Sequence, residues 1–114
     1  MKLPNADRAV VDVAKLRDYS LNPEHPKGKH KARVFLKILG LTQNDSDELR
    51  QIILDVILTA EATEEESIGY GRRFVVDFQL SGVGDSGTKT ALVRSAWIIR
   101  TGEDFPRLTT CFIL

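Results

Sequence analysis

Residues 74–80, Phe74-Val75-Val76-Asp77-Phe78-Gln79-Leu80, decide the fold of this chain. Apolar side chains occupy every second position of this stretch, and the polar residues Asp77 and Gln79 fall between them. A period of two predicts a β-strand with one buried face, and such strands are typical of antiparallel sheets. The residues that then face the core are Phe74, Val76, Phe78 and Leu80.

Two more strands are predicted after this one. A glycine-rich turn at 82–87 leads to a strand from Thr90 to Arg100, and a turn at 101–106 leads to a last strand from Arg107 to Leu114. For the middle strand, either Val93, Ser95, Trp97 and Ile99 or Leu92, Arg94, Ala96, Ile98 and Arg100 could pack inward. In the last strand, alternation separates a polar side, Arg107, Thr109 and Cys111, from the side formed by Leu108, Thr110, Phe112 and Leu114.

Three helices are predicted before the sheet. The first runs from Val13 to about Ser20 after an Asp12 cap, and the second from about Lys29 to Leu39, ending at Gly40. The third begins after Asp45 or Ser46, with Asp45 and Glu48 spaced as in a capping box. Helical spacing predicts that two sets of side chains are buried: Ala32, Phe35, Leu36 and Leu39, and Leu49, Ile52, Ile53, Val56, Ile57 and Ala60.

These elements predict an α+β fold in a single domain, residues 1–114. The N-terminal helices pack on one face of a three- to four-stranded antiparallel sheet formed by the C-terminal half. A chain of 114 residues is long enough for one such core and too short for two. The acidic segment around residues 61–66 is expected to be a solvated loop.

The charge of the chain is balanced, with 16 Lys and Arg against 16 Asp and Glu. A net charge of zero gives no overall attraction to nucleic acid, but the charges are unevenly distributed. Five cations against one acid lie between Asn22 and Leu39, whereas eight acids against one arginine lie between Asp45 and Glu66. A local basic patch can still bind an anion within a screening length.

Composition favours a cytoplasmic protein. The single cysteine, Cys111, cannot form an intrachain disulfide, which favours a reducing compartment. No apolar run approaches the ~20 residues of a membrane span, and the first residues lack the apolar stretch of a signal peptide. We expect no membrane association and no cofactor.

The glycines of two nucleotide-binding motifs are present, but the helix that both motifs require after them is not predicted. Residues 82–87 match the G-x-G-x-x-G fingerprint, and residues 82–90 nearly match a P-loop. Both motifs require a helix to follow the glycines, whereas Thr90–Arg100 has the pattern of a strand. A zinc site from His25, His30 and Cys111 would lack paired ligands and a fourth ligand, so no metal site is predicted.

The chemistry of the chain is concentrated in residues 22–32, Asn-Pro-Glu-His-Pro-Lys-Gly-Lys-His-Lys-Ala. Both histidines and three lysines lie within seven residues, where a loop runs into the second helix. Imidazole can transfer protons near neutral pH, and a helix N-terminus and lysines attract phosphate. The alternative is a polar loop that only caps a surface helix.

Metal-independent cleavage of RNA would use these groups, because RNA supplies its own nucleophile, the 2′-hydroxyl. His25 could be the base, and His30 or a lysine the acid. The catalytic candidates are His25, Lys31 and Thr109; the candidates for binding phosphate or RNA are Lys29, His30, Arg94, Trp97, Arg107 and Thr110. Trp97 could stack a base, although a tryptophan is also a common core residue. The threonines could equally be ordinary strand residues.

Residues 15–35 and 95–110 resemble an uncharacterised bacterial domain family, through Asn22-Pro23-x-His25-Pro26-x-Gly28 in particular. Related domains occur at the C-terminal ends of polymorphic toxins and in small toxin–antitoxin-like gene pairs. The order of helices and then sheet resembles the barnase–EndoU–colicin–RelE superfamily of ribonuclease toxins. That resemblance implies metal-independent RNA cleavage by His25, Lys29 or Lys31, Arg107 and Thr109, held in check by a cognate antitoxin or immunity protein.

Three functions are therefore expected to compete. The first is a small toxin-like ribonuclease controlled by a partner protein. The second is a non-catalytic protein-binding module, either immunity- or antitoxin-like or an inactive toxin homologue, with a basic partner docked on Glu61–Glu66. The third is a binder of a metal or a small anion. The oligomeric state is left open.

Overall fold

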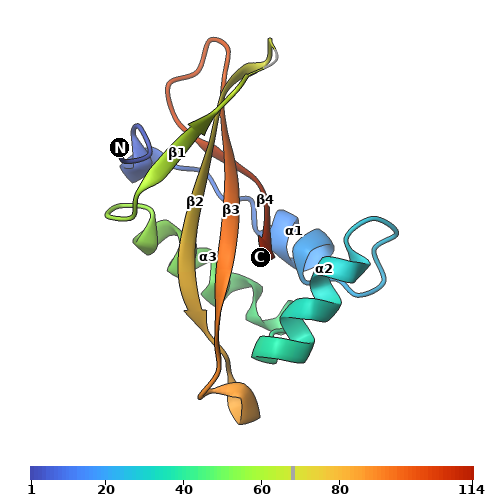
Figure 1. The fold of residues 1–114 in the computed structure, drawn as a ribbon. Helices are drawn as coiled ribbons and strands as arrows, with labels where there is room; N and C mark the ends of the chain where they lie inside the picture. Colours follow the sequence, from blue (N-terminus) through green and yellow to red (C-terminus); the bar gives the residue numbers. More distant parts are fainter. Residues whose placement is uncertain (68) are drawn as a thin grey trace.

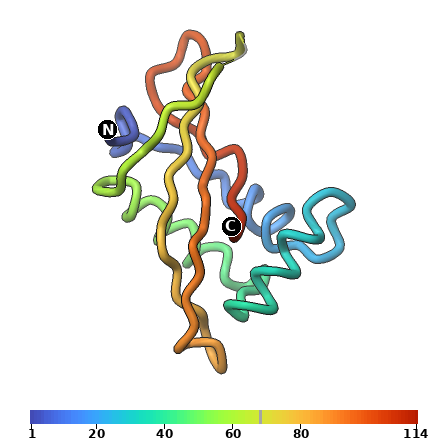
Figure 2. Tube along the Cα trace, viewed as in Figure 1, coloured from blue at the N-terminus to red at the C-terminus, as the bar shows by residue number. Residues whose placement is uncertain are grey.

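The computed structural model describes residues 1–67 and 69–114, and it confirms the predicted α+β fold. The helices come from the N-terminal half, and the C-terminal half forms a four-stranded antiparallel sheet in the order β1-β2-β3-β4 (Figure 1). In the trace of Figure 2 the long strands β2 and β3 run side by side through the whole molecule. The strands are β1 (Ala62–Glu65), β2 (Gly71–Ser81), β3 (Thr90–Arg100) and β4 (Arg107–Ile113).

The three predicted helices are present, and the first two each end in a wider π-helical turn. In order, the helical segments are α1 (Val13–Lys15) with its π turn Leu16–Ser20, α2 (Lys29–Val34) with its π turn Phe35–Leu39, and α3 (Ser46–Val56). Short 3-10 turns cover Ala6–Arg8, Gln43–Asp45 and Gly84–Ser86. Asp12 caps α1 as predicted, because its Oδ1 accepts the Ala14 N–H at 3.0 Å. Gly40 ends the second helix with a φ of 71°.

The core lies between the helices and one face of the sheet, with α3 behind β2 and β3 in Figure 1. Its largest fully buried side chains include Trp97, Phe35 and Phe74. The inner face of β3 is therefore the one that carries Val93, Ser95, Trp97 and Ile99. The opposite, outer face of the sheet carries Arg94 and Ile98. None of the helices described here is long and apolar enough to cross a membrane.

Two details of the predicted helices are wrong. Leu36 and Ile52 are 48% and 36% exposed, although their spacing placed them in the buried sets. The capping box also lies one turn earlier than predicted. Thr42 donates its backbone N–H to Asp45 Oδ2 at 2.8 Å, and Asp45 makes no side-chain cap of its own on α3.

The acidic segment at 61–66 is not a loop as predicted, since Ala62–Glu65 forms β1 at the edge of the sheet. Part of its charge is neutralised locally, because Arg72 on β2 donates two hydrogen bonds to Glu64, at 2.9 and 3.0 Å. Short, charged edge strands are one way in which proteins discourage edge-to-edge association. The acidic composition therefore marks an edge strand.

A bulge in β4 overturns the predicted faces of the last strand. Ala96 pairs with Thr110 and Trp97 with Leu108, so that Thr109 is an extra residue between them. Leu108 and Cys111 consequently both face the core, 4% and 0% exposed, although strict alternation placed them on opposite sides.

Candidate functional site

A cleft of about 520 Å³ opens where α1 and the loop before α2 meet β4. Four of the predicted site residues line it together, from three separate segments of the chain: His25, Lys31, Thr109 and Thr110. The rest of its lining comes from the first helix: Asp12, Ala14, Lys15, Asp18 and Tyr19. We call this hollow the β4 cleft.

His25 is held by its own loop. Its Nδ1 accepts the backbone N–H groups of Lys27 and Gly28, both at 3.0 Å. These two hydrogen bonds assign the proton of the neutral ring to Nε2. A base that works through Nε2 needs the opposite tautomer, so the predicted role of His25 as a base is wrong for this geometry. The ring is a fixed hydrogen-bond donor.

The same hydrogen bonds close the loop just before α2, although Gly28, at the N-cap position of that helix, makes no side-chain cap. The Lys29 N–H donates to the His25 carbonyl at 3.0 Å, so the N–H groups of residues 27–29 are all used within the loop. These three N–H groups are therefore not free for a phosphate. The loop also needs Gly28, because a Cβ there would lie 2.7 Å from the Tyr19 carbonyl oxygen.

Lys31 reaches from α2 over β4. Its Nζ lies 4.7 Å from the centroid of the Phe112 ring, a cation–π contact. Among the described residues, no carboxylate forms an ion pair with it. Lys31 therefore brings to the cleft a partly buried positive charge that forms no ion pair within residues 1–67 and 69–114.

The two threonines differ in what they can offer. Thr109 Oγ1 donates to the Ala96 carbonyl at 3.1 Å, which leaves only its lone pairs for a ligand. Thr110 Oγ1 is buried beneath the cleft and has no hydrogen-bond partner in the described part of the chain. Such a hydroxyl costs about 1–3 kcal/mol, which a polar ligand atom reaching it would offset. Of the two predicted threonines, Thr110 thus keeps its proton uncommitted, whereas Thr109 has already donated its own.

Sequence reasoning missed the contribution of the first helix. Asp12, Lys15 and Tyr19 are spaced i, i+3 and i+7, which places them on one helix face, and that spacing could have identified them. The Tyr19 ring packs edge-on against His25, with centroids 4.6 Å apart. Asp18 is bound through two hydrogen bonds by Arg17, which hold the pKa of its carboxyl below the usual value.

The carboxylate that remains available is therefore that of Asp12. Its Oδ1 accepts the Ala14 N–H, and no cation within the described ranges pairs with it. An exposed carboxylate with a free oxygen can accept a proton from a ligand hydroxyl. The cleft thus combines one such carboxylate with two lysines.

Other predicted site residues lie elsewhere. Trp97 is 1% exposed, and its Nε1 donates to Ser95 Oγ at 2.9 Å inside the core, so it cannot stack a base as predicted. Arg94 is bound on the outer face by Asp77, at 2.8 and 2.9 Å, which lowers the pKa of that carboxyl. Lys29 and His30 are on α2 and do not line the cleft.

Arg107 lies beside the cleft rather than in it. Its guanidinium donates two hydrogen bonds to Glu103, both at 2.9 Å, and it lines a smaller hollow that adjoins the cleft. These hydrogen bonds lower the pKa of Glu103. The predicted phosphate-binding role of Arg107 would require part of this ion pair to open.

Neither the cysteine nor a metal cluster adds to the site. Cys111 is fully buried, and burial raises the pKa of its thiol to about 12, against the smaller opposing effects of Ser20 and Lys31. Such a thiol is not a nucleophile near neutral pH. In residues 1–67 and 69–114, no group of three or more His, Cys, Asp or Glu side chains is arranged to hold a metal.

Comparison with known proteins places the chain in a family. Neither the curated proteins nor the solved structures gave a match. One family profile matches residues 2–114, nearly the whole chain, and its description is "Domain of unknown function (DUF6883)". The chain belongs to the DUF6883 family.

Proposed function

We propose that this protein cleaves RNA in the β4 cleft without a metal ion. The observation that carries the proposal is the meeting of His25, Lys31 and Thr110 in one hollow, although they lie up to 85 residues apart in the chain. An imidazole, an ammonium group and a hydroxyl are all side-chain groups that can bind a phosphate oxygen. The resemblance to ribonuclease toxins supports the same function.

Residues of the cleft can supply both proton transfers that RNA cleavage needs. The RNA 2′-oxygen attacks the adjacent phosphorus and passes its proton to the Asp12 carboxylate, while the bond from phosphorus to the 5′-oxygen breaks. Lys15 protonates the departing 5′-oxygen. The products are a 2′,3′-cyclic phosphate and a 5′-hydroxyl.

The remaining groups stabilise the charge that builds up on the phosphate. Lys31 supplies a positive charge that no carboxylate in the described residues neutralises. His25 Nε2–H and the Thr110 hydroxyl supply hydrogen bonds to the non-bridging oxygens. Donors that are already held in place stabilise such a transition state without having to reorganise, and the loop fixes the His25 ring through two hydrogen bonds.

Replacing His25 separates its two roles and tests the proposal. In His25→Asn, the amide oxygen can still accept the N–H groups of Lys27 and Gly28, but the Nε2–H donor is lost. We expect wild-type stability and a loss of about 10²-fold in cleavage rate. His25→Ala should lose both the donor and the cap, with about 1 kcal/mol lower stability.

The assay uses purified protein, a single-stranded RNA oligonucleotide and excess EDTA, with detection of the cyclic phosphate end. Urea unfolding of the same samples measures stability. The proposal fails if the wild type does not cleave the RNA, or if His25→Asn cleaves it as fast as the wild type.

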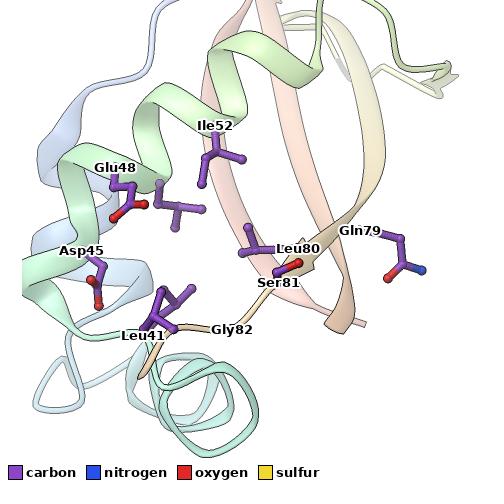
Figure 3. A pocket seen from close by; sticks show the side chains of 10 residues that line it. Leu41, Asp45, Glu48, Ile52, Gln79, Leu80, Ser81 and Gly82 are labelled. Atoms are coloured by element: carbon purple, nitrogen blue, oxygen red, sulfur yellow. The ribbon is translucent and has the colours of Figure 1, made fainter. Parts of the chain in front are cut away.

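A second candidate function, a protein-binding module, is favoured by a groove on another side of the molecule. This groove, about 360 Å³, lies between the first half of α3 and the end of β2 (Figure 3). Its apolar lining is Leu41, Leu49, Ile52, Leu80 and Val83. Asp45 and Glu48 project from the α3 side of the same hollow. Such a lining suits a partner segment that carries an apolar anchor beside a basic residue.

On the predicted Glu61–Glu66 surface, two of the four acids are already paired. Glu61 is bound by the N-terminal ammonium group at 2.7 Å, and Glu64 is bound by Arg72. Glu48, in contrast, has no ion-pair partner among residues 1–67 and 69–114. The groove and the β4 cleft have no lining residue in common. A partner could therefore bind in the groove whether or not the cleft catalyses a reaction.

Replacing Ile52 tests the groove. Ile52→Asp is expected to weaken binding of a cognate antitoxin or immunity protein, the partner that the resemblance implies, by at least about tenfold, because it puts an unpaired charge where an apolar anchor docks. Titration calorimetry with the two purified proteins measures the change. Leu58→Asp is the matched control, since Leu58 is 47% exposed and does not line the groove. Equal effects of both variants, or no effect of Ile52→Asp, would exclude the groove as the docking site.

A further inference from the structure

Three hollows follow one another from the β4 cleft to the far end of the sheet. The cleft shares Asp12, Lys15 and Thr109 with a hollow of about 120 Å³. That hollow shares Ile98 with a third, of about 340 Å³, which is also lined by Tyr70, Gly71 and Arg73. Because each hollow shares lining residues with the next, the three are neighbours on the molecule, and we call this series the track.

The register of the sheet explains why the track is basic in its second half. Ile98 on β3 pairs with Arg73 on β2 and with Arg107 on β4, so two arginines flank one apolar residue in a row across three strands. Strands lie about 4.8 Å apart, which makes this row about 10 Å wide. Arg100 lies two residues further along β3 and therefore on the same outer face. We call Arg73, Ile98, Arg100 and Arg107 the arginine row.

Two of these arginines are available to a ligand. Arg107 is bound by Glu103, but no ion pair of Arg73 or Arg100 is found among the described residues. The nearest acid in the register is Glu65, opposite Arg73 on β1. With Lys15 and Lys31 in the cleft, five cations line the track. Its lining contains the acids Asp12 and Asp18, and Glu103, bound to Arg107, lies beside it, where the charge of Arg100 also helps to lower the pKa of Glu103.

Both ends of the track carry a tyrosine. Tyr19 lines the cleft, and Tyr70 is 80% exposed beside the third hollow. Aromatic rings that face solvent can stack on bases that are not paired with another strand. Guanidinium groups between them suit the phosphates of the same strand, which they can bind through two hydrogen bonds.

We infer that the substrate is single-stranded RNA several nucleotides long, whose backbone runs from the β4 cleft across the arginine row to Tyr70. This inference rests on the proposed function for the identity of the ligand. It adds a binding surface outside the cleft, which makes affinity depend on the length of the strand. Arg73 and Arg100 bind this strand and take no part in the chemistry.

Binding of RNA that cannot react tests the track separately from cleavage. Fluorescence anisotropy would use 2′-O-methyl oligoribonucleotides of two, four and eight nucleotides, in which the attacking hydroxyl is blocked. We expect affinity to rise with length for the wild type. In the double variant Arg73→Ala, Arg100→Ala, the eight-nucleotide strand should bind at least about tenfold more weakly, with a salt dependence about 1.4 smaller in log–log slope, as for two lost phosphate contacts.

Arg72→Ala is the matched control, because Arg72 precedes Arg73 on β2, is also exposed, and lies on the opposite face, over Phe74 and against Glu64. It should bind the eight-nucleotide strand like the wild type.

The outcomes separate the two proposals. If the wild type cleaves RNA but its binding does not depend on length or on Arg73 and Arg100, the track is wrong and the proposed function stands. If binding depends on both but RNA is not cleaved, the track holds and catalysis is wrong. Preference for a DNA duplex, or no binding at all, overturns the track.

Discussion

Trp97→Ala is expected to lower the free energy of unfolding by about 3–5 kcal/mol, the usual cost of removing a large aromatic side chain from a core. Trp97 is 1% exposed and packs opposite Phe74 on the neighbouring strand. Its Nε1–H donates to Ser95 Oγ, which in turn donates to the Val76 carbonyl at 2.8 Å. A domain of this size is stable by about 5–15 kcal/mol, so the variant should unfold at much lower urea concentration, measured by circular dichroism.

Two controls show that the effect comes from burial. Leu92→Ala removes a side chain from the outer face of the same strand, where Leu92 is 40% exposed, and should change stability by no more than about 1 kcal/mol. Trp97→Phe keeps most of the apolar volume and should cost less than Trp97→Ala. It should also cleave RNA like the wild type per folded molecule, because Trp97 does not reach the cleft. A large loss of stability in Leu92→Ala, or none in Trp97→Ala, would contradict the assignment of the inner face.

The long strands could be predicted from the sequence because one of their faces is buried. Alternation identifies β2 in the sequence, and a run of β-branched residues identifies β3, whose bounds Thr90–Arg100 are those predicted. The inner face of β3 could not be chosen, because both of its sides contain apolar residues. The answer depends on the pairing with β2, where Phe74 faces Trp97.

The errors in the sheet have two physical causes. β1 lies at an edge and buries only Ala62, so its pattern is that of a solvated segment. In β4 the bulge inserts Thr109, and this one residue reverses the side on which every later residue lies. An inserted residue of this kind leaves no periodic signal in a strand of seven residues.

The sequence predicts which site residues lie close together in the chain, but not which distant residues meet them in the fold. The clustering of His25 with lysines is visible in the sequence, but their meeting with Thr110 requires β4 to pack beside α1 and α2, as Figure 1 shows. The role of His25 was also hidden, because its Nδ1 is occupied by N–H groups of its own loop. Charge and residue type alone do not say which nitrogen remains.

Lys31→Met is expected to reduce RNA cleavage by about 10²–10³-fold, the usual effect of removing one preorganised group that stabilises a transition-state charge. Methionine keeps most of the length of the side chain, and the lost contact between Nζ and the Phe112 ring should cost only about 0.5–1 kcal/mol. The fold should therefore persist, so that the rate measured at saturating RNA reports on chemistry. Lys31→Arg retains the charge and should recover part of the rate.

The matched control for Lys31→Met is Lys27→Met, which removes an exposed lysine from the loop before α2. Lys27 does not line the cleft, and only its backbone contacts His25 in the hydrogen bonds described here. If the reaction depended on the general basic character of residues 27–31, both variants would lose activity equally. If it depends on the geometry of the cleft, only Lys31→Met would. If Lys31→Met cleaved RNA at the wild-type rate, the transition state would not depend on the charge of Lys31. There would then be no reason to place the chemistry in the β4 cleft.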